Sequence, residues 1–78
     1  MGYWAMDDLP YVRSERTVEA PLDAALLVVV PQELQNLEEL IAQNGQESVG
    51  EMEIIPVQED SPLPEGHRTF EFRLHHTV

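Results

Sequence analysis

The chain has 78 residues, and 15 Asp or Glu against 4 Lys or Arg give it a formal net charge of -11 at pH 7. A chain of this length buries only ~60% of the surface that its unfolded form exposes, so two lobes with a cleft between them are excluded. It has no cysteine for disulfides, thiolate nucleophiles or Cys-ligated metals, and too few cations to bind a phosphate backbone directly.

Residues 1–10 have a mixed composition and are expected to form an arm ahead of a single domain at 11–78. The arm shows no basic n-region followed by an apolar h-region. The longest apolar run, Ala24 to Val30, is seven residues, far below the ~18 that a membrane span needs. We therefore expect a cytoplasmic protein without a membrane segment.

A strand is predicted from Tyr11 to Ala20, because Val12, Thr17 and Val18 favour extended structure. Pro21 follows and would end it. Both faces of this strand would mix charged and apolar side chains, which is typical of a strand at the edge of a sheet.

The segment from Leu22 to Val30 contains an uninterrupted apolar run that ends in three valines. β-Branched residues favour strands, and a strand without polar alternation is buried on both faces. This segment is therefore predicted to be a fully buried strand. Since one helix covers only one face, the strand would need further cover from the arm, from a second copy of the chain or from another protein.

A helix is predicted from Gln32 to Asn44, directly after Pro31, whose missing N–H is tolerated in a first helical turn. Glu33 would lie near the helix start and complement its dipole, and the Asn-Gly pair at the end favours a left-handed stop. Apolar residues recur at helical spacing: Leu34, Leu37 and Ile41. The opposite face is expected to be exposed to solvent, with Glu38 on its flank: Gln32, Gln35, Asn36, Glu39 and Gln43.

Two further strands are predicted after the helix. In the segment from Met52 to Val57 the alternation breaks and Pro56 follows, which indicates an edge strand or a bulge. Residues 67–77 alternate cleanly, with Phe70 and Phe72 on one face, as in a half-buried strand. The Pro-rich loop between the two would make them an antiparallel hairpin.

The predicted element order is therefore β-β-α-β-β. The expected fold is a small two-layer α+β sandwich of about four mainly antiparallel strands and one helix. The strands before and after the helix, if adjacent and parallel, would form a right-handed crossover unit.

No signature of catalysis is present, so we predict that the protein is not an enzyme and uses no cofactor. Its serines lie in no nucleophile motif, its glycines are scattered, and no lysine can neutralise a phosphate. In a strand, His75 and His76 point to opposite faces, and His67 lies ~26 Å from His75 along an extended chain. We therefore predict no metal site; weak metal binding by the His75-His76 pair is the alternative.

The excess of negative charge attracts basic partners and speeds their capture. Carboxylates can occupy basic grooves in place of phosphates, which predicts an inhibitor of a nucleic-acid-binding protein. Acidity for solubility or for a salt-adapted proteome is the alternative explanation. Tyr and Trp side chains of the arm could anchor the interface, because they bury large area at small entropic cost. The predicted partner contacts are Trp4, Tyr11, Glu33, Glu38, Glu39, Glu51, Glu53, Glu59 and Asp60.

Two resemblances bear on function. The run from Ala25 to Leu34, followed by a strand, a loop and the residues Arg68 to Phe72, resembles the first half of PII-like ferredoxin-fold sensors. That likeness implies a homo-oligomeric small-ligand sensor or accessory subunit, although no second helix follows Phe72. In size, acidity and lack of motifs the chain is also similar to phage-encoded inhibitors of host defence, such as anti-CRISPR proteins and DNA mimics.

Overall fold

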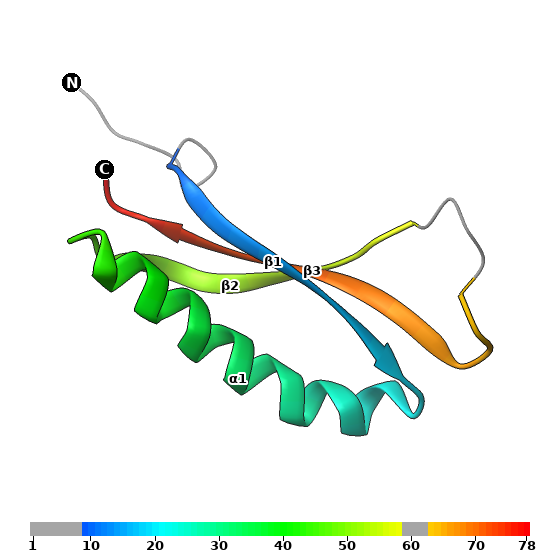
Figure 1. Cartoon of the computed structure of the whole chain (residues 1–78). Coiled ribbons are helices and arrows are strands. Elements are labelled where there is room, and N and C mark those ends of the chain that lie inside the picture. Colours follow the sequence, from blue (N-terminus) through cyan, green and yellow to red (C-terminus); the bar gives the residue numbers. More distant parts are fainter. Residues whose placement is uncertain (1–8, 59–62) are drawn as a thin grey trace.

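The computed structural model of the chain describes residues 9–58 and 63–78. Its elements follow the order β1 (Tyr11–Glu19), α1 (Leu22–Gln43), β2 (Ser48–Pro56) and β3 (His67–His76). The three strands form one antiparallel sheet in the order β1-β3-β2, and α1 lies along one face of it (Figure 1). The protein is therefore a small α+β fold with the element order β-α-β-β.

β3 is the central strand because it pairs with both of the others. Phe72, near its middle, lies opposite Ser14 of β1 and Ile54 of β2. The predicted edge positions are confirmed, since β1 and β2 flank β3. The predicted hairpin of β2 and β3 is also confirmed. Its register is regular from Glu53 to Pro56, where the sequence suggested a possible bulge, and shifts earlier, between Val49 and Glu53.

The predicted strand from Leu22 to Val30 is wrong, because these residues form the first half of α1. The helix begins after Pro21, and Asp23 in its first turn complements the helix dipole. The apolar stripe of the second half continues upstream through Leu26 and Val30, which pack against the core. The four-strand β-β-α-β-β order is consequently wrong, as is the parallel crossover, since β1 and β2 lie on opposite sides of β3.

The predicted helix start at Pro31 is also wrong, because α1 continues through this residue. Pro31 has no N–H, so the carbonyl of Leu27 loses its usual hydrogen bond four residues on. Leu27 lies at the surface, where water can take the place of that donor. The predicted helix end is confirmed: Asn44 is the C-cap, and Gly45 has a φ of 73°.

The main core lies between β3 and α1. Phe72, Leu74 and Ile41 are its most buried large side chains. On the opposite face of β3, Glu71 and His75 are buried as well. The prediction of a half-buried strand is therefore corrected, because neighbours on both flanking strands cover that face of a central strand.

Candidate protein-binding surface

The first half of α1 carries more apolar surface than the sheet covers. Leu26 and Val30 pack against the core, whereas Leu27 is 78% exposed and Val28 is 69% exposed. A helix that is apolar around most of its circumference is normally buried on several sides. Contiguous apolar exposure on a small protein is typical of an interaction site.

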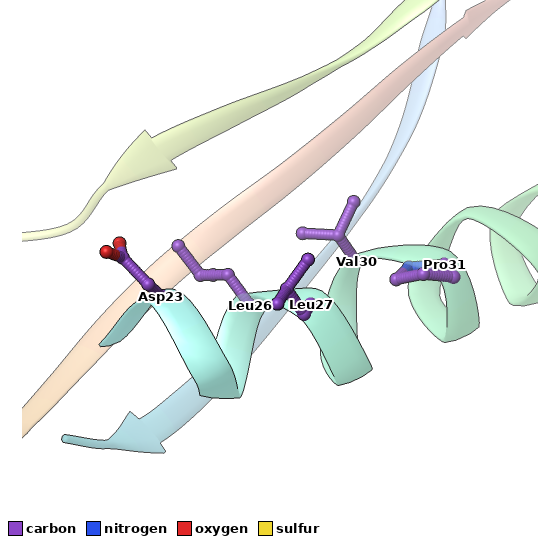
Figure 2. Close-up of a pocket in the computed structure, with 5 residues that line it drawn as sticks. All are labelled: Asp23, Leu26, Leu27, Val30 and Pro31. Atoms are coloured by element: carbon purple, nitrogen blue, oxygen red, sulfur yellow. The ribbon is translucent and has the colours of Figure 1, made fainter. Parts of the chain in front are cut away.

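An open groove of about 490 Å³ runs along one flank of this half-helix. Figure 2 shows its lining residues, all of them from α1: Asp23, Leu26, Leu27, Val30 and Pro31. On the same face of the sheet, Ile54 of β2 is 40% exposed although it lies opposite the buried Phe72. The helix packs mainly against β1 and least against β2. One helix is therefore too narrow to cover all three strands.

The charges are distributed unevenly between helix and sheet. α1 contains no Lys, Arg or His, and its charged residues are Asp23, Glu33, Glu38 and Glu39. All four cationic side chains of the chain lie on β1 and β3: Arg13, Arg16, Arg68 and Arg73. Every charged side chain of α1 is therefore acidic, and its other exposed side chains are apolar or neutral polar groups.

Glu33 lies in the middle of α1 and not near its start, and it is only 2% exposed. Ser14 Oγ donates a hydrogen bond to Glu33 Oε2 at 2.6 Å, and Arg16 Nη2 lies 2.7 Å from Glu33 Oε1. These contacts satisfy a carboxylate in the α1–β1 interface, where a bare charge would be costly. Glu33 therefore joins the helix to β1 and is not available at the surface.

A second ionic cluster lies on the face of the sheet away from α1. Glu71 binds Arg73 of its own strand and Arg13 of β1, the latter at 3.3 Å, and the Arg73 guanidinium lies 5.1 Å from the centre of the Tyr11 ring. The hydrogen bond from Arg73 holds the pKa of Glu71 below its ordinary value of 4.5, although burial acts in the opposite direction. The charges of Arg73 and Arg13 lower this pKa further.

His75 connects β3 to two other segments. Its Nδ1 lies 3.1 Å from the Leu9 carbonyl oxygen, and its Nε2 lies 2.9 Å from Glu53 Oε1. Both partners are hydrogen-bond acceptors, so a ring nitrogen of His75 that carries a hydrogen can donate to the partner that it faces. The Tyr11 ring also meets the His75 ring edge-on at 5.3 Å. On the face of the sheet away from α1, His75 therefore links β3 to β2 through Glu53 and to the segment before β1 through Leu9.

The predicted partner contacts are spread over the molecule. Glu38 and Glu39 are exposed on α1, and Glu51 is exposed on β2 near its register shift. Glu53 and Tyr11 lie on the face of the sheet opposite the helix, in contact with His75. The remaining predicted contacts lie outside the described residues: Trp4, Glu59 and Asp60. The groove residues Leu26, Leu27 and Val30 were missed, although their helical spacing with Leu37 and Ile41 is visible in the sequence.

Three further properties of residues 9–58 and 63–78 bear on where a functional surface lies. No group of three or more metal-ligating side chains occurs there. The buried polar side chains of this part of the chain all have hydrogen-bond partners within the protein. No helix in it combines the length and the apolar character needed to cross a membrane. The exposed flank of α1 is therefore the best candidate for a functional surface.

Comparison of the chain with models of known protein families, with curated proteins and with solved structures finds no match in any of the three. The likeness to PII-like sensors rested on a strand-to-helix turn between Ala25 and Leu34, which the structure shows as continuous helix. What the structure defines by itself is the class: a small α+β protein with one helix on a three-stranded antiparallel sheet.

Proposed function

We propose that the protein is a small acidic inhibitor that binds a basic, nucleic-acid-binding surface of another protein. The observation that supports this proposal is the way the chain uses its few cations. Arg16 is paired with Glu33, and both Arg13 and Arg73 are paired with Glu71. Three of the four arginines are thus paired with buried carboxylates within the fold.

The exposed carboxylates of α1 remain without such compensation. Among the described residues, no ion pair involves Glu38 or Glu39. A field of one sign on a small body steers oppositely charged partners into contact and raises their rate of association. Proteins that bind nucleic acids present the Lys and Arg side chains that such a field attracts.

Neutralising the acids of α1 should slow capture of a basic partner. For the double variant Glu38→Gln/Glu39→Gln, we expect association with an immobilised arginine-rich DNA-binding peptide to slow several-fold, with a smaller change in dissociation. Wild-type affinity should fall at least about tenfold between ~0.05 M and ~0.2 M salt. Surface plasmon resonance at several salt concentrations measures both effects.

The matched control is the double variant Glu47→Gln/Glu65→Gln, which removes the same charge from exposed positions outside α1. It should slow association less. Duplex DNA should compete with the wild-type protein for the peptide, because both use the same cations. Affinity that is indifferent to salt, or binding that DNA leaves unchanged, would rule out the proposed function.

A further inference from the structure

We infer that the groove on the flank of α1 is the docking site for an amphipathic helix of the partner protein, with an apolar centre and Lys or Arg at both ends. This inference rests on the proposed function, because it names the part of the basic partner that the chain would bind. It assigns the apolar contacts to the groove and to Leu34 beyond it, and the ionic contacts to Asp23 at one end of the groove and Glu38 about two turns past the other.

A single line of side chains along α1 carries the argument. Asp23, Leu27, Pro31, Leu34 and Glu38 follow one another at spacings of four, four, three and four residues. Residues at such spacings share one flank of a helix. Three apolar residues therefore lie between two acids, and at ~1.5 Å per residue the acids are ~22 Å apart. A partner helix of similar length would match this pattern with a basic residue near each end.

The lining of the groove suits the apolar side of such a helix. The groove is open to solvent and has apolar walls, and Asp23 is its one charged lining residue. Leu27, at its centre, is the most exposed leucine of the described part of the chain. Leu27 and Pro31 line the groove, and the half-buried Leu34 follows just beyond it. Their spacings of four and three residues are those that the anchors of a helix in an apolar groove use.

A second copy of the chain fits this groove poorly. In an antiparallel pair of α1 helices, Asp23 of each copy would meet Glu38 of the other. In a parallel pair, each acid would meet its own equivalent. Both arrangements place like charges together, and each copy carries a net charge of -11. The ionic pattern therefore selects a partner of the opposite sign.

The described chain enters the fold at the end of β1 that lies away from the start of α1. Residue 9 precedes the first residue of β1, whereas α1 begins just after the last residue of that strand. The nine residues of β1 therefore separate the entry of the described chain from the start of α1, and at ~3.3 Å per residue the strand is ~30 Å long. Figure 1 shows the N-terminal end of β1 beside the C-terminal half of α1.

The test uses two synthetic peptides of about 18 residues, the length of a helix that spans the groove and both acids. The first has leucines at spacings of four and three in its centre and lysines at both ends. The second has the same composition and the same terminal lysines, with its leucines scattered around the helix. Fluorescence anisotropy at ~0.15 M salt gives the Kd of each peptide for wild-type protein, for Leu27→Ser and for Leu40→Ser.

Leu40→Ser is the matched control, because Leu40 is an exposed leucine of α1 that lines a different, more polar depression. We expect the patterned peptide to bind wild-type protein at least about tenfold more tightly than the scattered peptide. Leu27→Ser should abolish that difference, and Leu40→Ser should preserve it. Because both leucines are exposed, circular dichroism should show that both variants fold.

The outcomes separate the groove from the wider proposal. Equal binding of both peptides, weakened by salt but unchanged by Leu27→Ser, would overturn the docking inference and leave the acidic inhibitor standing. A loss of affinity in Leu40→Ser as large as that in Leu27→Ser would also overturn it. If neither peptide bound even at low salt, the inference and the proposed function would fail together.

Discussion

Phe72→Ala is expected to lower the free energy of unfolding by about 3–5 kcal/mol. Phe72 is 0% exposed, lies in the central strand and belongs to the cluster that joins the sheet to α1. Its removal would forfeit the transfer energy of the ring and leave a cavity between the two layers. Domains of this size have only about 4–12 kcal/mol in total, so the variant should be partly or largely unfolded. Urea titration followed by circular dichroism measures the change.

Leu27→Ala is the control for this experiment, because it also truncates a large apolar side chain but at an exposed site. Its effect should stay within about 0.5 kcal/mol, since alanine is a better helix former and little packing is lost. Similar destabilisation by both variants would contradict the assignment of the core to the space between β3 and α1.

Glu71→Gln should destabilise the protein near neutral pH by about 1.5–3 kcal/mol, the range for hydrogen bonds to charged groups. The pKa of Glu71 is lowered in the folded state by Arg73 and Arg13. A depressed carboxyl pKa contributes stability that is present above the unfolded value and is lost as the pH falls through the folded value. The wild-type protein should therefore lose this advantage over Glu71→Gln below about pH 4.5.

Urea titrations of both proteins between about pH 3 and pH 7 provide the measurement. Glu15→Gln is the control, because Glu15 lies opposite Glu71 on β1 but is exposed, and its nearest cation, Arg13, is 3.9 Å away. This variant should follow the wild-type profile. A Glu71→Gln curve that runs parallel to the wild-type curve at all pH values would show that Glu71 does not form the ionic contacts described for it.

Much of the fold could be predicted because the spacing of apolar residues shows which face of a strand or helix is buried. The alternation around Phe70 and Phe72 locates β3, and the mixed faces of β1 correctly indicate an edge strand. The helical spacing of Leu37 and Ile41 locates the second half of α1. Both kinds of spacing show which side of a strand or helix is apolar, and in the folded protein that side faces the core.

The first half of α1 was misread because two local signals outweighed the periodicity. Three consecutive valines favour a strand and Pro31 favours a helix start, but tertiary packing of a continuous apolar stripe can override such local preferences. Glu33 also interrupts the apolar stripe in the sequence, because a carboxylate occupies one of its core positions. Its partners, Ser14 and Arg16, come from β1. Such a non-local pairing cannot be read from the sequence around Glu33.

The candidate site was predicted only in part for the same reason. The acidity of Glu38 and Glu39 is evident from the sequence, and both residues are exposed as expected. The apolar groove was missed because Leu27 and Val28 were placed in a buried strand. As expected, the apolar run that contains them has more apolar side chains than the described sheet covers, but the uncovered ones lie on a helix and not on a strand.

The measurement that tests the account most directly is the reactivity of a single thiol in the groove. The chain has no cysteine, so Leu27→Cys carries one unique thiol, and Ile41→Cys, checked for folding, serves as the buried reference. We predict that Leu27→Cys in the isolated protein is alkylated almost as fast as in urea, at every protein concentration, and is protected by the patterned Leu/Lys peptide. A thiol already protected in the isolated chain, above all one whose protection grows with protein concentration, would contradict an open groove that awaits a basic partner.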